Sequence, residues 1–504
     1  MRLQYSSYYM KHYMIILLIS LVVTPTTTMA QTQGQRTLSL SEAIAIARTK
    51  SVDASVALNE LRTAYWEYRT YKANLLPELN FTASLPSYYK QYSPYLNAEG
   101  SYSFVRTNYL EMSGELSVTQ KIWATGGTLS LNTSIDFLRQ LEVPKYNRFM
   151  SIPVAMTLNQ PLFSVNTAKW DRKIEPVRYA EAKAAFLSAT EEVAMMAITR
   201  YFNLLMAMET QNIAKQNLSN AEKLYEVAKE KRAIGQISKN DLLQMELNLL
   251  NARSKMTDAD SEHKSMMFQL KAFLDIDDAT DIIPEVPEVP HTRHVAYDDA
   301  LNKALANNEF SLNIRRRQLQ ADYQVAQAKG NLREISLFAQ IGFTGMDTEL
   351  CDAYNPLKDN QVVEIGLKIP LVDWGKRRGK VKVAESNRKL TQERIRQERQ
   401  NFSQDIFILV ERFNNQLSQV NLAMRADTIT QQRYDTNVET YLIGRISTLD
   451  LNDSQVSKDE ARQTFVNELY QYWYFLYQLR SLTLWDYVEN KGIEAEIELI
   501  LSQN

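Results

Sequence analysis

The sequence is poor in the residues that build disulfides and metal centres. Its 504 residues include a single cysteine, Cys351, which has no second cysteine with which to form an intramolecular disulfide. The four histidines show no metal-ligand spacing; they are His12, His263, His291 and His294. We therefore predict no metal and no other cofactor.

Signatures of an enzyme are also lacking. The chain contains no glycine-rich phosphate-binding loop and no recognisable pairing of a nucleophile with a base. Adjacent acids such as Glu191-Glu192 and Asp298-Asp299 fall on predicted helices, where we expect solvated faces. The net charge of −2 gives no electrostatic reason to expect a nucleic-acid partner. We predict neither an enzyme nor a nucleic-acid-binding protein.

Long apolar runs are absent beyond the first thirty residues. The only such run, Met14 to Val23, follows Arg2 and Lys11 and precedes the small-residue site at 28–30. This order is typical of a signal peptide covering residues 1–30. The alternative, a transmembrane anchor, would need about 20 apolar residues. Since no later run is long enough to span as a helix, a membrane location for the mature chain would require a β-barrel.

One short motif occurs twice and organises the rest of the chain. Ala-Ile-Gly-Gln-Ile-Ser at 233–238 returns as Leu-Ile-Gly-Arg-Ile-Ser at 442–447, and an Asp-Leu pair follows each copy. Other pairs, such as Tyr225 and Tyr434, keep the same offset of 209 residues, which indicates an internal duplication. Each copy reads as a helix end at a lone glycine followed by a Ser-x-x-Asp helix start. We therefore predict two long helical hairpins.

The 14 glycines are so few that helix should dominate. We expect helices over 38–74, 166–232, 239–274, 295–329, 376–441 and 448–485, with Pro176 delaying or kinking the second. Apolar-polar alternation predicts strands at 79–85, 115–122, 128–137, 151–163, 335–343 and 363–369. The resulting segments are a signal peptide (1–30), a first repeat with an extra hairpin (31–280), a proline-rich linker (281–293), a second repeat (294–486) and a tail (487–504).

The strands raise a question of closure. We expect about four of them to be of barrel type, and four strands cannot close on themselves and bury their edges. Several chains must therefore contribute to one barrel. The 27 tyrosines, many of them near the strand loops, then suggest an aromatic girdle. The alternatives are that tyrosine simply fits strands and loops, and that the chain is a plain coiled-coil rod, which leaves the strands unexplained.

In these features the chain resembles the TolC-type outer-membrane efflux proteins, or outer-membrane factors. The resemblance rests on the signal peptide, the duplicated helix-strand-strand-helix order, Leu76-Pro77, the Gln160–Phe163 segment and the two Ile-Gly-x-Ile-Ser tips. It implies a mainly α fold with a membrane β-barrel. Long helical hairpins form a periplasmic tunnel, and three chains of a homotrimer share the barrel. The family acts as a passive exit duct of the outer membrane, in contact with outer-membrane lipid, docked through a periplasmic adaptor (membrane fusion) protein to an inner-membrane pump.

The resemblance also carries roles onto particular residues. The tips that contact the adaptor would be Ile234, Gly235, Ile237, Ser238, Ile443, Gly444, Ile446 and Ser447. The gate that narrows the periplasmic entrance would comprise Tyr441, Arg445, Asp450 and Asp453. A close relative has arginine two residues after the second glycine, whereas this chain has Ile446 there and Arg445 one place earlier, so the closing network is expected to be wired differently.

Two questions stay open at this point. Asp450 can be a helix cap, a gate residue or both, while Asp453 is no part of the cap. For the whole chain we favour export of small toxic compounds. The alternatives are a type I-like protein export duct and, in a different class, a trimeric coiled-coil surface or scaffold protein.

Overall fold

The computed structural model describes residues 35–96, 100–142, 145–277, 280–290, 292–332, 334–368, 372–443, 445–494 and 497. The predicted signal peptide, residues 1–30, lies outside the described residues. The chain divides into two compact units, the first comprising residues up to Ala47 with Ala197–Glu288 and the second comprising Arg48–Met196 with Val289–Asn504.

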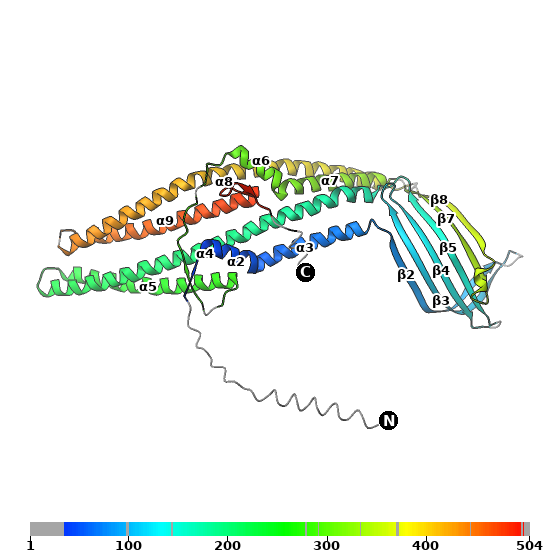
Figure 1. Cartoon of the computed structure of the whole chain (residues 1–504), viewed down its shortest axis with the longest axis horizontal. Helices are drawn as coiled ribbons and strands as arrows, with labels where there is room; N and C mark the ends of the chain where they lie inside the picture. The colour runs from blue at the N-terminus through cyan, green and yellow to red at the C-terminus, as the bar shows by residue number, and fades with distance from the viewer. Residues whose placement is uncertain are drawn as a thin grey trace, which may run out of the picture. The chain divides into compact units, whose positions relative to one another are not determined.

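A six-stranded antiparallel sheet forms one end of the second unit, with strand order β2-β3-β4-β5-β7-β8 (Figure 1). The strands are β2 Glu78–Leu96, β3 Tyr102–Ile122, β4 Gly127–Gln140, β5 Asn147–Pro161, β7 Glu334–Asp347 and β8 Lys358–Lys368. The 3₁₀ turn η1 (Asp352–Tyr354) lies in the β7–β8 connection. The sheet thus has six strands rather than the four expected, because the extra hairpin joins it.

Apolar-polar alternation predicted no strand in the tyrosine-rich stretch 86–110, and the sheet extends into this stretch. Residues 86–96 belong to β2 and residues 102–110 to β3, and their ladder runs from Tyr88 opposite Leu110 to Leu96 opposite Tyr102. Proline is tolerated here because β2 is an outer strand, whose free edge has no ladder hydrogen bond to lose. Pro86 also falls at a register shift between Ser84 and Ser87, where the ladder is already interrupted.

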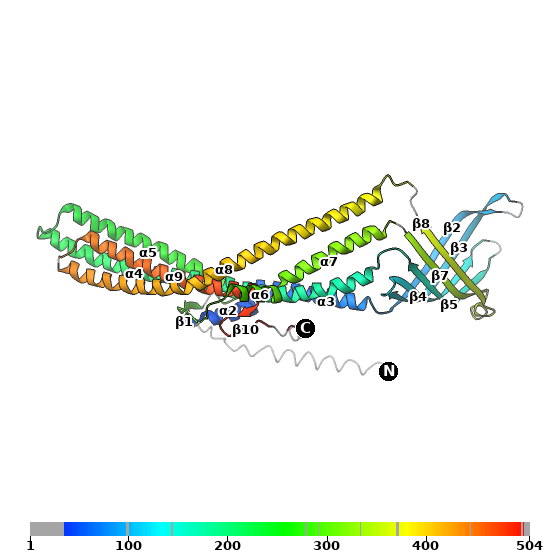
Figure 2. The same cartoon turned by 90° about the horizontal axis from the view of Figure 1, so that it is seen from above.

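Four helices join the sheet at the same end (Figure 2). α3 (Val52–Ala73) leads into β2 and α7 (Glu309–Gly330) leads into β7, while α4 (Thr167–Ala233) follows β5 and α8 (Lys376–Leu442) follows β8. Asn166 fixes the start of α4. Its Oδ1 accepts from Lys169 N at 3.0 Å, and its Nδ2 donates to Trp123 O at 2.9 Å in the β3–β4 turn.

Two predicted helices are each divided in two by a capping residue. The stretch 38–74 contains α2 (Leu40–Lys50) and α3, and Ser51 caps α3 by accepting from Ala54 N at 3.1 Å. The stretch 295–329 contains α6 (Tyr297–Asn307) and α7, where Asn308 accepts from Phe310 N at 2.9 Å. The helical periodicity continues across both breaks, so only the cap chemistry marks them.

The duplication is visible in the element boundaries. α4 and α8 each contain 67 residues, and α5 (Lys239–Leu274) and α9 (Thr448–Thr483) each contain 36. All four boundaries of the second pair lie 209 residues after those of the first. α4 begins at Thr167, so Pro176 lies inside the helix and does not delay it.

Within the first unit, a short parallel pair ties the start of the predicted linker to the chain's N-terminal strand. β1 (Gln35–Leu38) pairs with β6 (Asp281–Pro284), so the predicted extended linker begins as a strand. The hydroxyl oxygen of the buried Tyr201 on α4 lies 2.8 Å from Leu38 O and 2.7 Å from Glu285 O, so the two carbonyls share its single proton. No helix among the described residues is long and apolar enough to cross a membrane.

A buried ion-pair network holds the second unit together and corrects one prediction. Glu191, expected on a solvated face, is only 1% exposed. Its carboxylate accepts from Arg48 Nη2 at 2.5 Å and from Arg480 Nε at 3.0 Å. Arg480 also reaches Asp486 in β9 (Trp485–Asp486), which pairs with β10 (Lys491–Gly492) in the predicted tail. Asp298 and Asp299 are exposed, as predicted.

Candidate functional site

One face of the six-stranded sheet carries large, exposed apolar side chains. The strand register aligns a row of large apolar side chains across five strands, and each is more than a third exposed. The row consists of Leu79, Val118, Leu131, Met156 and Ile341. Phe81, Leu116, Val363 and Ile365 extend it on the same face. In water an exposed apolar surface of this kind is unfavourable, which indicates a lipid or protein environment for this face.

The opposite face of the sheet carries mainly small and polar side chains. Its central row consists of Asn80, Ser117, Asn132, Ala155, Gly342 and Asn360. The next row contains Thr119, Ser130, Thr157 and Gln340. Because successive residues of a strand point to opposite faces, the same alternation produces both surfaces. Apolar-out and polar-in alternation is the pattern of a membrane barrel wall around water.

The outer strands of the sheet each have one partner strand in the described residues. β2 pairs only with β3, and β8 pairs only with β7, so the sheet is open. Each outer strand therefore presents a row of backbone N–H and C=O groups without ladder partners. The edges can be satisfied by another copy of the same sheet.

In the first unit, the tip between α4 and α5 is a tight, exposed turn. Gly235 has a φ of 77°, in the left-handed region that favours glycine, and Gln236 N donates to Lys231 O at 2.8 Å. Ile234 is 69% exposed, whereas Ile237 is half-buried. Ser238 starts α5 with a capping box, since Asp241 N donates to its Oγ at 3.1 Å and its own N donates to Asp241 Oδ2 at 3.0 Å.

The second tip, between α8 and α9, repeats this chemistry within the second unit. Ile443 is 66% exposed and Arg445 is exposed, while Tyr441 and Ile446 are half-buried. Gly444 lies outside the described residues. Ser447 forms the same capping box, because Asp450 N donates to its Oγ and its own N donates to Asp450 Oδ2, both at 3.2 Å.

The two acids after this tip have different partners. Asp450 is the N3 residue of the capping box, and the hydrogen bonds from Ser447 lower the pKa of its carboxyl, with a smaller contribution from Arg433. Asp453 instead accepts from Arg433 Nη2 at 2.8 Å, across the hairpin from α8. Both side chains of that pair are at least half exposed, so the pair contributes little stability and can open readily.

Arg433 was not among the residues selected from the sequence. A signal for it exists, because Arg433 and Asp453 stand at similar distances on either side of Gly444. In an antiparallel helix pair joined by a short turn, such positions face each other. The duplicated tip therefore predicts which residues can pair across the hairpin, and the charge pattern then identifies Arg433.

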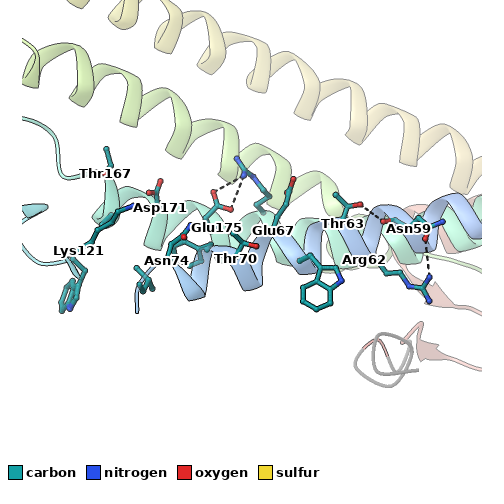
Figure 3. A pocket seen from close by; sticks show the side chains of 16 residues that line it. Asn59, Arg62, Thr63, Glu67, Thr70, Asn74, Lys121, Thr167, Asp171 and Glu175 are labelled. Carbon is teal, nitrogen blue, oxygen red and sulfur yellow. Dashed lines mark hydrogen bonds and ion pairs between the residues drawn. The ribbon is translucent and has the colours of Figure 1, made fainter. Parts of the chain in front are cut away.

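A cavity of about 900 Å³ opens beside α3 and the first turns of α4 in the second unit (Figure 3). Its lining includes Arg62, Trp66, Glu67, Lys121, Trp123, Asp171 and Glu175. Partial burial raises the pKa values of the Asp171 and Glu175 carboxyls, although Arg178 lies 3.1 Å from Glu175 and opposes the shift. Among the described residues, no group of His, Cys, Asp or Glu side chains could hold a metal ion. The cavity has the character of a polar groove.

Solved structures with the same fold include channels of the bacterial outer membrane. The Campylobacter jejuni CmeC outer membrane channel is 16% identical, covers 92% of this chain and 89% of its own, and gives a TM-score of 0.65. The Vibrio cholerae outer membrane protein VceC is 16% identical, with 90% and 97% covered and a TM-score of 0.60. The Neisseria gonorrhoeae MtrE channel, solved in its open state, is 14% identical, with 90% and 91% covered and a TM-score of 0.59.

These TM-scores, at such low identities, establish a shared fold and no more; it is mainly helical with a β-sheet, as predicted from the sequence. A search of the curated proteins found no match. The family model described as outer membrane efflux protein matches residues 43–274 and 300–483, which is most of the chain. The chain belongs to the outer membrane efflux protein family, as the sequence resemblance predicted, and is a protein of the bacterial outer membrane.

Proposed function

We propose that the chain is the passive exit duct of a tripartite export system. Three copies would join their sheets edge to edge and close one barrel in the outer membrane. The observation that carries the proposal is the sheet with one apolar and one polar face, continuous with long helical hairpins. The apolar face would contact outer-membrane lipid, and the polar face would line a water-filled passage.

The strand number agrees with a passage of this kind. Three sheets of six strands would give a barrel of 18 strands. Barrels of about 16–18 strands are wide enough to leave an aqueous channel, whereas about eight strands are filled by their own side chains. A duct of this width can pass small molecules without specific binding, which supports small toxic compounds as cargo.

The helical hairpins would continue the passage through the periplasm. A helix of 67 residues is about 100 Å long at 1.5 Å per residue. Such a length exceeds the needs of a compact core and suits a wall that spans a compartment. The exposed Ile234 and Ile443 at the tips would offer apolar anchors to a periplasmic adaptor protein, which would link the duct to an inner-membrane pump.

The second tip would also carry the entrance gate. Gly444 and Ser447 would shape the turn, and Tyr441, Arg445, Asp450 and Asp453 would surround the axis of the trimer. Three symmetry copies of each carboxylate near one axis would repel one another and attract cations. The pairing of Asp453 with Arg433 supplies a partner that can release the acid when the entrance changes shape.

Single-channel conductance in planar bilayers tests the proposal. The variant Asp450→Asn/Asp453→Asn removes both charges, and asparagine at 450 keeps an acceptor for the cap. We expect the wild type to form a narrow, cation-preferring channel and the variant to lose a large part of that preference. The matched control is Asp241→Asn at the first tip, which alters the same capping box in the other hairpin.

The outcomes separate the parts of the proposal. If the variant keeps the selectivity of the wild type, the acids are helix caps and surface charges and the gate assignment is wrong. If Asp241→Asn changes selectivity as much as the double variant, the effect belongs to hairpin structure. If folded wild-type protein forms no channel, the duct itself is wrong.

A further inference from the structure

The β2–β3 hairpin extends beyond the rest of the sheet. The last residue of β3 to pair with β4 is Tyr109, opposite Gln140, yet β2 and β3 stay paired as far as Leu96 opposite Tyr102. We call residues 88–96 with 102–110 the ribbon; it projects at the sheet end away from the helices (Figure 1). From Asn108 to Tyr102 it advances about 20 Å at 3.3 Å per residue.

Aromatic and cationic side chains share one face of the ribbon. Across the two strands the register pairs Tyr88 with Leu110, Lys90 with Asn108, Tyr92 with Arg106, Pro94 with Phe104, and Leu96 with Tyr102. Tyr92, Tyr102 and Phe104 are 67%, 73% and 72% exposed. In β3 these even-numbered positions continue into Leu116 and Val118, so this is the same face as the apolar face of the sheet.

Within the ribbon, positive charge lies only on that face. Lys90 and Arg106 are the only charged residues among the described residues of the ribbon, and Arg139 on β4 lies opposite Leu110 on the same side. Arg106 Nε lies 3.0 Å from Glu142 Oε1, whereas Lys90 and Arg139 form no ion pair within the described part of the chain. The other face carries uncharged residues such as Gln91, Ser103 and Thr107.

We propose that this ribbon face binds the phosphorylated sugar headgroup of lipopolysaccharide in the outer leaflet. Aromatic rings present apolar faces that stack on the C–H surfaces of sugars, and lysine and arginine form charge-assisted hydrogen bonds with phosphate oxygens. The inference rests on the proposed function, because it requires the helices to lie in the periplasm and the ribbon to point outward.

The length of the ribbon distinguishes this ligand from an ordinary phospholipid. The polar layer of a phospholipid bilayer is only about 5–8 Å thick on each side. A ribbon that rises about 20 Å above the neighbouring strands would leave most of its aromatic and cationic side chains above such a layer. A lipid with a large phosphorylated saccharide head reaches that height, so the ribbon face can follow it outward.

Equilibrium binding of fluorescent lipopolysaccharide to the purified protein in phosphatidylcholine nanodiscs tests the inference. We expect Lys90→Gln/Arg106→Gln/Arg139→Gln and, separately, Tyr92→Ser/Phe104→Ser to weaken binding at least tenfold. Gln91→Ala/Thr107→Ala on the opposite face is the control and should stay within twofold of the wild type. Dephosphorylated lipopolysaccharide should bind the wild type about as weakly as the intact form binds the triple variant.

Unchanged affinity in both the cationic and the aromatic variant would overturn the inference, as would competition by phosphatidylglycerol vesicles at the same phosphate concentration. The wild type is also measured as a channel in bilayers free of lipopolysaccharide. If the wild type conducts there but the ribbon variants bind lipopolysaccharide as tightly as the wild type does, only the ribbon inference is wrong. If the wild type does not conduct, the proposed duct function is wrong.

Discussion

At the scale of single residues, two glutamates near the α4–α7 contact illustrate opposite electrostatic situations. Glu181 on α4 accepts a bidentate pair from Arg316 on α7, with Nη2 at 2.8 Å and Nε at 2.5 Å. Glu309, the first residue of α7, forms no such ion pair with the residues that the structure describes. Burial first, and then repulsion from Glu192 and Glu181, raises the pKa of its carboxyl. The ionised carboxylate of Glu309 at the start of α7 therefore destabilises the folded state.

Glu309→Gln should stabilise the protein near neutral pH. A carboxyl whose pKa is higher in the folded state costs nothing below its unfolded pKa, about 4, and its full penalty above the folded pKa. The substitution should therefore raise the thermal midpoint at pH 8, by an amount equivalent to at most about 1 kcal/mol, and leave it unchanged at pH 3.5. Glu181→Gln is the contrasting variant. It removes the carboxylate partner of Arg316 and should therefore lower the thermal midpoint at pH 8. A lower midpoint for Glu309→Gln at pH 8 would contradict the prediction.

At the scale of elements, the hairpin tips depend on two equivalent capping boxes. Ser447→Ala should remove a cap worth about 1 kcal/mol and increase hydrogen exchange about fivefold in residues 447–455. Ser238→Ala should do the same in residues 238–246 and leave the second tip protected. Ser447→Thr keeps the hydroxyl acceptor and should restore protection. Equal exchange in Ser447→Ala and wild type would show that the tip is held by contacts other than its cap.

The tips were predictable because their signals are local. A lone glycine between long helical segments that are otherwise poor in glycine, followed by Ser-x-x-Asp, specifies a turn and a capped restart without reference to the rest of the chain. The strands at 86–110 were not predictable in this way, because Pro86 and Pro94 argue against strand unless β2 is known to be an outer strand. Strand order is a property of the whole sheet, and no short window of sequence contains it.

The same distinction explains the electrostatics. Glu191 reads as a surface acid on its helix, yet its partners Arg48 and Arg480 are 143 and 289 residues away in the sequence. Arg433 and Asp453 are only 20 residues apart, but they meet only once the hairpin is folded. Charge pairs of this kind can be predicted only when the positions of the helices that carry the two residues are known.

At the scale of the whole molecule, the open sheet constrains how copies of the chain can assemble. Its two edges, β2 and β8, differ from each other, and in the proposed ring β2 of one copy would pair with β8 of the next, which is a head-to-tail contact. A head-to-tail contact either closes into a ring or grows without limit. Closure removes every free edge, which is the reason a barrel of several chains is stable in lipid.

Disulfide trapping across these edges tests closure and counts the copies. Neighbouring strands lie about 4.8 Å apart, within the Cα separation that a disulfide accepts. In a Cys351→Ser background, one cysteine is placed on β2 (Asn80, Thr82 or Ser84) and one on β8 (Asn360, Val362 or Glu364), and the nine combinations are oxidised in membranes.

Combinations in register should give a denaturing-gel ladder that stops at three chains. Each single-cysteine variant should stay monomeric, because β2 never faces β2 in a head-to-tail ring. A ladder running beyond three chains would mean an open filament or a larger ring, and one stopping at two would mean a dimer. If all nine combinations stay monomeric although both cysteines react with a small maleimide, the sheet edges do not meet. The apolar face would then need another partner.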